Sequence, residues 1–326
     1  IIECKLALFY FYIVLGMFVE NRCFEEKWVL MYLHFAQDRH KVKIEKSKNV
    51  FSNVVLDFPN SKGELSKFRV YEAPIMEKGL ADRYPDIKSY VGEGLENPNS
   101  KIYFSVSPLG LSSMRINGEK ALFIEPYTKD LSTYVIYERS QKEDLNQFEC
   151  GVMNSIETQA AKNPITKSAD DGKLRTFRLA LSCTGEYAAH FGGTKAGALA
   201  AMNRTMTRVN AIYERDLGIR MRMINNVDII YTNPITDPYS DPMRKNAWNA
   251  QVQNTLTLVV GDSNYDIGHL FGANVTGGNA GGIGSVCING SKGSGYTAST
   301  VPYGDSFDVD YVAHEMGHQF GANHTF

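Results

Sequence analysis

The sequence predicts a mixed protein of α+β and α/β character, in which a mainly β region precedes an α/β region. Between residues 49 and 139, short runs rich in β-branched and aromatic residues alternate with turn residues. After residue 175, strand-like runs alternate with long helical patterns, which is the order expected of a sheet covered by helices. The hydrophobic content of 43% and charged content of 21% are globular values, so 326 residues suffice for two domains.

Residues 1–48 form an N-terminal segment that we interpret as a candidate export signal. Residues 6–19 are an apolar run preceded by Lys5, about as long as a signal-peptide core and too short to span a bilayer comfortably. Neither this run nor the apolar stretch 28–36 ends in a clean cleavage site with small residues. The alternative is upstream sequence with no structural role. We expect a secreted, extracellular protein without a stable membrane span.

Residues 49–152 are expected to form the mainly β domain. Its strand-like runs are 53–58, 68–71, 101–106, 121–125 and 133–137, each bounded by turn residues. Residues 79–91 are its one expected helix. No acids, histidines or nucleophiles stand there in catalytic spacing, and the polar stretch 153–174 that follows has the composition of a linker.

Residues 175–326 carry the alternating pattern of the second domain. A strand-like opening at 176–182 precedes a long helical pattern over 185–222 that ends near Gly218, and a strand-like run covers 219–230. A second helix is expected over 246–256, and residues 256–260 fit a helix or an extended strand equally well.

The residues with the clearest chemistry stand at the end of the chain. His314 and His318 are four residues apart, so on a helix both imidazoles face one metal ion, with Glu315 beside them. Gly321 ends the helix because glycine enters left-handed backbone without steric cost, and His324 then returns as a third ligand. Three nitrogen ligands and one open position are typical of a catalytic zinc.

Further residues support a helix here. Asp308 or Ser306 is expected to cap its N-terminus, and Val312, Met316 and Phe320 are expected to form its core-facing side. The alternative is that three histidines and a glycine fell into this spacing by chance on an ordinary helix.

The spacing H-E-x-x-H-x-x-G-x-x-H resembles the signature of the metzincin metallopeptidases. The chain resembles their reprolysin-like, adamalysin-type branch, in particular bacterial secreted members with an N-terminal propeptide. The resemblance implies a metzincin-type α/β sandwich over 175–326 and a zinc endopeptidase acting on proteins or peptides. Zn²⁺ on His314, His318 and His324 would activate water, with Glu315 as general base. Metzincins continue past the third histidine to a methionine turn, so we expect the catalytic domain to be truncated after the zinc helix.

Cys150-Gly151-Val152 resembles the cysteine switch of metzincin zymogens. The resemblance implies that 49–152 is a propeptide, that Cys150 is a zinc ligand in the zymogen, and that activation cleaves within 153–174. The alternatives for Cys150 are a small buried cysteine or an unrelated disulfide partner.

The glycine-rich stretch 277–287 lacks the Gly-Lys-Ser/Thr ending of a phosphate loop and the glycine spacing of a dinucleotide site. By resemblance it is the loop and edge strand above the metal, where a peptide substrate adds as one more strand. We assign the substrate contact to Gly282, Ile283, Gly284, Ser285 and Val286; the alternative is a flexible loop only. His269 is not assigned to the metal, because three ligands already exist.

Composition narrows the classes of partner and of function that remain open. A net charge of −2 gives no electrostatic case for nucleic acid, and no oligomer is indicated. The five cysteines are an odd number, and a disulfide between Cys183 and Cys287 stays open. Two rival functions remain. One is an inert secreted binding or adhesion module stabilised by zinc; the other is a regulator whose β domain inhibits proteases in trans.

Overall fold

The computed structural model of the chain describes residues 15–20, 29–35, 54–118, 120–139, 148–152 and 172–324. Contacts divide the chain into two compact units, one of Ile1–Pro74 and Asp86–Lys142 and the other of Ile75–Pro85 and Glu143–Phe326. Most of the candidate export segment 1–48 and of the linker 153–174 lies outside the described residues. None of the described helices has the length and apolarity that a bilayer crossing requires.

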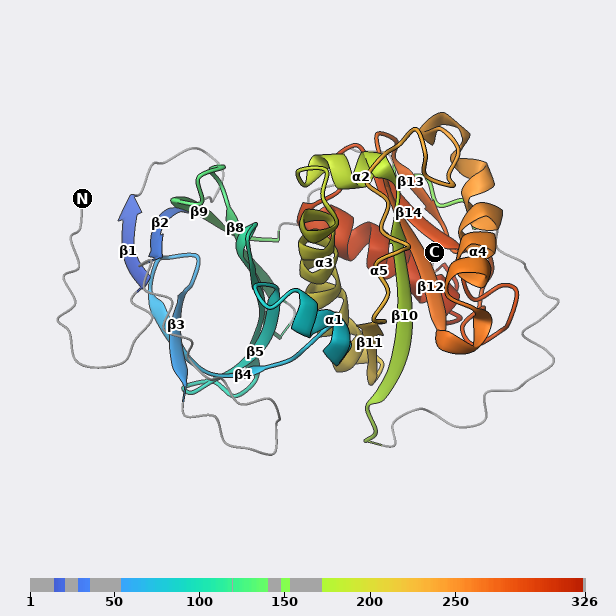
Figure 1. Cartoon of the computed structure of the whole chain (residues 1–326). Helices are drawn as coiled ribbons and strands as arrows, with labels where there is room; N and C mark the ends of the chain where they lie inside the picture. The colour runs from blue at the N-terminus through green and yellow to red at the C-terminus, as the bar shows by residue number, and fades with distance from the viewer. Residues whose placement is uncertain are drawn as a thin grey trace. The chain divides into compact units, whose positions relative to one another are not determined.

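The first unit is a curved sheet of nine antiparallel strands in the order β1-β2-β9-β8-β7-β6-β5-β4-β3 (Figure 1). From β3 to β9, consecutive strands are neighbours, and aromatic and aliphatic side chains such as Phe68, Phe104 and Tyr134 fill its core. The strands are β1 (Leu15–Glu20), β2 (Val29–Phe35), β3 (Val55–Pro59), β4 (Leu65–Glu72), β5 (Lys88–Gly94), β6 (Ser100–Ser107), β7 (Gly110–Asn117), β8 (Lys120–Pro126) and β9 (Thr133–Glu138). The mainly β region that the sequence predicts is confirmed.

The second unit is a five-stranded sheet in the order β11-β10-β12-β14-β13. Its strands are β10 (Arg175–Cys183), β11 (Ile219–Met223), β12 (Ile267–Ala273), β13 (Gly277–Asn279) and β14 (Gly295–Ser299). All pair in parallel except β13, which lies antiparallel to β14 at the edge. The central strand β12 is buried at every residue, as expected of a sheet covered on both faces. The predicted α/β character is confirmed.

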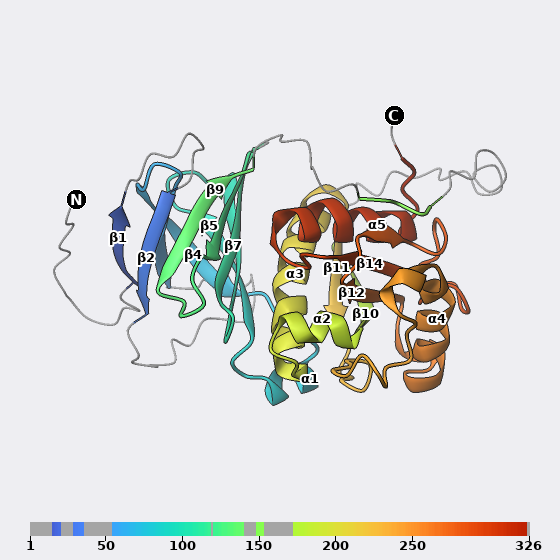
Figure 2. The same ribbon diagram turned by 90° about the horizontal axis from the view of Figure 1, so that it is seen from above.

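Helices cover the two faces of this sheet. Figures 1 and 2 show α3 (Lys195–Asp216) and α5 (Ala313–Gln319) on one face and α4 (Trp248–Val259) on the other. On the α4 face, Trp248, Val252 and Leu256 pack with Leu270 and Tyr296 in one core. Residues 256–259, for which the sequence left helix and strand open, therefore complete α4.

Two helix predictions were wrong in their bounds. The pattern over 185–222 contains two helices, α2 (Gly185–His190) and α3, because Gly192 and Gly193 both adopt positive φ and break the helix. The expected helix over 79–91 is α1 (Lys78–Arg83) followed by β5. Pro85 disfavours helical backbone at the residue before it, so the helix ends at Arg83.

The segment Ile75–Pro85, which contains α1, belongs to the second unit. Met76 forms a parallel bridge with Met223 at the end of β11. The Met223 N–H donates to the Ile75 carbonyl at 2.8 Å, and the Glu77 N–H donates to the Met223 carbonyl at 2.8 Å. This short piece of the N-terminal region therefore lies at the β11 edge of the five-stranded sheet.

The described cysteines of the second unit carry no disulfide. Cys183 is buried, Cys287 is exposed, and both are free thiols. The disulfide that the sequence left open between them is absent.

Candidate metal and catalytic site

The helix that carries the histidines starts earlier than its sequence suggests. A π-helical segment, η3 (Ser306–Val312), runs directly into α5. Val312 and Met316 are fully buried, and Phe320 packs edge-on against Phe177 at 5.1 Å between ring centroids. Gly321 has φ +108° and follows the end of the helix, as predicted.

The predicted N-cap was wrong. Neither Ser306 nor Asp308 caps the helix, because both lie inside η3. The fully buried Asp308 carboxylate accepts hydrogen bonds from Thr205 Oγ at 2.6 Å and from the Arg208 guanidinium at 2.9 Å. Arg208 is also buried, so the two charges require each other. This ion pair ties the histidine helix to α3, and no local sequence pattern indicates it because the partners are 100 residues apart.

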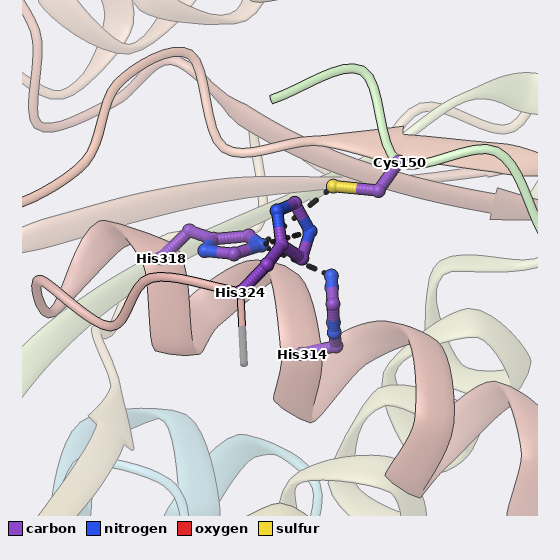
Figure 3. A group of neighbouring side chains, drawn as sticks. All are labelled: Cys150, His314, His318 and His324. Carbon is purple, nitrogen blue, oxygen red and sulfur yellow. Dashed lines mark hydrogen bonds between the residues drawn. The ribbon is translucent and has the colours of Figure 1, made fainter. Parts of the chain in front are cut away.

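Three histidines meet on one side of this helix. His314 and His318 project from α5, and His324 returns from the segment after Gly321 (Figure 3). The Nε2 atom of His318 lies 3.0 Å from Nε2 of His314 and 3.1 Å from Nε2 of His324. Nδ1 of His318 lies 2.7 Å from the Ala322 carbonyl oxygen, which only accepts, so the proton is on Nδ1. The Nε2 lone pair of His318 is therefore free to bind a metal.

A fourth potential ligand comes from the N-terminal side of the linker. Cys150 Sγ lies 3.6 Å from His318 Nε2, and the four ligand atoms lie within 4.8 Å of one another (Figure 3). In a tetrahedral zinc site, nitrogens at about 2.0–2.1 Å from the ion lie about 3.3 Å apart, and a sulfur at about 2.3 Å lies about 3.6 Å from each. The three spacings of 3.0, 3.1 and 3.6 Å are close to these values, and two imidazole-bearing helix positions, a third histidine and a thiol are donors that zinc accepts, so the donor set fits a zinc ion.

Burial keeps the imidazoles of His314 and His318 neutral, as metal ligands must be. Burial lowers the pKa of His314 to about 4, and the neighbouring His318 and His324 rings add to the effect. Burial likewise lowers the pKa of His318.

Glu315 lies beside the cluster and is completely buried. Burial raises the pKa of its carboxyl group to about 7, while the nearby Cys150 thiol and Ala280 N–H act in the opposite direction with smaller effect. Neither carboxylate oxygen has a well-formed hydrogen bond to any residue that the structure describes. A carboxylate poised near neutrality and without a fixed partner suits proton transfer.

Gly278 makes room for this carboxylate. A Cβ added at Gly278 would lie 2.5 Å from Glu315 Cγ and 2.6 Å from Oε1. Glu315 therefore reaches the site only because the neighbouring residue of β13 has no side chain. Gly278 was not among the predicted site residues, although the paired glycines at 277 and 278 are a sequence signal of close packing.

The edge strand was placed wrongly by the sequence analysis. It is β13 at Gly277–Asn279, whereas Gly282, Ile283, Gly284, Ser285 and Val286 lie in turns. Gly281 and Gly284 have φ of +73° and +72°, a left-handed backbone that breaks a strand. The turn still approaches the site, because the Gly284 N–H donates to the His318 carbonyl at 2.9 Å.

The segment around Cys150 lies along β13, where Cys150 and Gly278 form a parallel bridge. The Gly151 N–H donates to the Gly278 carbonyl at 2.8 Å, and the Gly278 N–H donates to the Glu149 carbonyl at 3.0 Å. Asn279 Nδ2 donates to the Gly151 carbonyl at 3.1 Å. This register directs the Cys150 side chain at the three histidines.

Phe148 adds an aromatic contact between the Cys150 segment and the histidine helix. Its ring stacks on Tyr311 at 4.1 Å between centroids and meets His314 edge-on at 5.9 Å. Burial, with a further contribution from Glu315, raises the pKa of the Cys150 thiol to about 12, so without a metal the thiol is neutral.

His269 lies apart from the ligand set, as the sequence analysis assigned it. Its ring is fully buried in β12 between Gln319 Oε1 at 2.7 Å and Thr297 Oγ at 2.9 Å. Gln319 follows His318 directly, so His269 supports the end of the histidine helix.

A parallel sheet with one antiparallel edge strand, followed by a helix that gathers three histidines and a buried glutamate, defines a metallopeptidase of metzincin type. Residues 173–326 match the family described as "Metallo-peptidase family M12B Reprolysin-like", and this part of the chain is a reprolysin-like metallopeptidase domain. The family implies a bound metal, normally zinc, and protein or peptide substrates.

Among solved structures, the chain is similar to one titled "Crystal Structure of metalloproteinase-II from Bacteroides fragilis". The two share 13% sequence identity with a TM-score of 0.44, over 83% of this chain and 81% of the other. No curated protein matches the sequence.

Proposed function

We propose that the chain is the latent precursor of a secreted zinc endopeptidase, with Glu315 as general base and Cys150 as the group that blocks the metal. The observation that carries this proposal is the convergence of Cys150, His314, His318 and His324, whose ligand atoms lie within 4.8 Å of one another beside a buried carboxylate.

In the active form, His314, His318 and His324 would hold the zinc ion. When bound there, zinc would polarise the scissile carbonyl and lower the pKa of the attacking water. Glu315 accepts a proton from that water and returns it to the leaving amine.

The substrate backbone pairs with β13. Gly278 offers its N–H and its carbonyl to an extended peptide, and in the intact chain Glu149 and Gly151 use these two groups. A substrate strand and the Cys150 segment therefore compete for the same edge.

Latency follows from this competition. The Cys150 sulfur occupies the position that the water needs, and the linker 153–174 is where we place the activating cleavage. The segment Ile75–Pro85 gives the precursor a second attachment at the β11 edge, opposite to β13 in the strand order. One cut in the linker then leaves both attachments intact, so full activity requires that the released pro-segment dissociate or be degraded.

Secretion rests on the apolar run at residues 6–19. Latency serves a protein-degrading enzyme of this kind by delaying its activity until the precursor reaches its destination.

The general base is tested by casein cleavage after linker proteolysis, with wild type beside Glu315→Ala and zinc content measured in both. We expect the variant to retain zinc and lose cleavage by at least about 10²-fold, the lower range for loss of a general base. Equal, negligible activity in both proteins with zinc bound would favour the inert binding or adhesion module instead.

The cysteine switch is tested with Cys150→Ser in the uncleaved chain. A serine hydroxyl is a far weaker zinc ligand than a thiolate, so the variant is expected to cleave casein before linker proteolysis. A fully latent Cys150→Ser protein, which becomes active only on proteolysis, would contradict this role for Cys150.

A further inference from the structure

The edge strand β13 also borders a cavity on the face of the sheet that α4 covers, opposite to the face that carries the histidine helix. This cavity of about 270 Å³ lies beside β13, where α4 begins. Its lining residues are Glu149, Gly151, Lys245, Asn246, Asn249, Gly278, Asn279 and Tyr296. All of them belong to the second unit.

The alternation of β13 separates this cavity from the metal site. Gly278 faces Glu315, whereas a Cβ at Gly277 would lie 2.7 Å from Lys245 Nζ. On the same side as Gly277, the side-chain Oδ1 of Asn279 accepts from Asn249 Nδ2 at 3.4 Å. A peptide strand added to β13 alternates in the same way, so neighbouring side chains point to the metal and to the cavity in turn.

The Cys150 segment displays this alternation. Cys150 points at the histidines, and the preceding residue, Glu149, brings its Oε2 to 3.6 Å from Lys245 Nζ. Lys245 is the one cation among the described residues that line the cavity. Its ammonium also donates to the Thr276 carbonyl at 2.6 Å, and only 18% of its side chain is exposed. The charge is therefore held in place at the cavity by the start of β13.

We propose that this cavity is a substrate side-chain subsite that selects an acidic residue, with Lys245 as the specificity determinant. The proposal rests on the peptidase function proposed above. In the precursor, Glu149 lines the rim of the subsite with its carboxylate 3.6 Å from Lys245 Nζ, while Cys150 points at the three histidines, so the pro-segment resembles a bound substrate in both respects.

We expect the preference for an acidic side chain to be moderate, because the carboxylate in this contact is open to solvent. The Glu149 side chain is 78% exposed, and water screens its attraction to Lys245. We expect glutamate to be favoured over glutamine by about 3–10-fold at one substrate position.

The first test is cleavage specificity of the linker-cleaved protein. Peptide pairs that differ by Glu or Gln at single positions around the cut bond are compared by kcat/KM. At one position the ratio of kcat/KM for the Glu peptide to that for the Gln peptide should be about 3–10 in wild type and in Lys245→Arg. The same ratio should fall to about 1 in Lys245→Met. Arg244→Met, an exposed neighbour that does not line the cavity, is the matched control and should keep the preference.

The second test needs no catalysis and uses the uncleaved chain. Alkylation of Cys150, followed by mass spectrometry of its peptide, measures how often the pro-segment leaves β13. Glu149→Gln and Lys245→Met should each accelerate this alkylation by about 3–10-fold, and the double variant should be no faster than either single one.

The two tests fail separately. Cleavage without a preference for Glu, or a preference that persists in Lys245→Met, overturns the subsite but leaves the peptidase intact. If neither wild type nor any variant cleaves a peptide, and the double variant is alkylated no faster than either single one, the peptidase function is overturned and the cavity is supported as an acid-binding pocket. Additive alkylation effects in Glu149→Gln and Lys245→Met would overturn the contact between them.

Discussion

Gly278→Ala is expected to disable the enzyme while leaving its fold and metal ligands intact. The new Cβ would lie 2.5 Å from Glu315 Cγ and 2.6 Å from Oε1, against about 3.5–4.0 Å for an ordinary carbon contact. Glu315 must therefore retreat by about 1 Å, and a misplacement of this size costs about 10²-fold in rate. That factor corresponds to about 2.7 kcal/mol of lost transition-state stabilisation.

The assay is kcat/KM on a peptide substrate, with zinc content and thermal unfolding measured in parallel. Gly282→Ala is the matched control, because a Cβ there meets no atom within 4 Å and its φ is not in the left-handed range. The control should keep activity. Full activity in Gly278→Ala would refute the view that Gly278 makes room for Glu315.

Two further predictions concern the buried polar groups around the histidine helix. Arg208→Met leaves the Asp308 carboxylate buried without its cation, so the free energy of unfolding should fall by about 3–5 kcal/mol. The double variant Arg208→Met/Asp308→Leu should recover most of this lost free energy, as measured by urea unfolding. A double variant that is no more stable than Arg208→Met would contradict the pairing. His269, whose pKa burial lowers to about 4, stays neutral in the fold while it gains a proton near pH 6.5 when unfolded. Its contribution to stability is therefore present above pH 6.5 and is lost as the pH falls towards 4, by up to about 3 kcal/mol. Unfolding of wild type and His269→Gln at pH 7 and pH 4.5 checks this, and an equal loss of stability in both would contradict it.

The sequence predicted most of what is periodic or local. Strand runs of the first unit, the α4 pattern and the end of the histidine helix at Gly321 all follow from alternation, helical spacing or glycine backbone, which are properties of neighbouring residues. The spacing of His314 and His318 fixes their common face for the same reason.

What the sequence missed depends on contacts between distant residues. Asp308 looked like a helix cap because its neighbours suit one, yet buried Arg208 on α3 takes its carboxylate. The edge strand was misplaced within a run where glycines permit both turns and strands, and only pairing with β14 selects Gly277–Asn279. The hydrogen-bonding register of Glu149 and Gly151 on β13, and the Lys245 contact it produces, had no signal in the local pattern.

The most direct test of the central claim is X-ray absorption at the zinc edge, on the purified chain before linker proteolysis and after removal of the pro-segment. The account predicts one zinc with three nitrogen ligands and one sulfur ligand at about 2.3 Å in the intact chain. After activation, an oxygen ligand should replace the sulfur while the three nitrogens remain. An intact chain whose zinc has no sulfur ligand, or one that binds no zinc, would contradict the account.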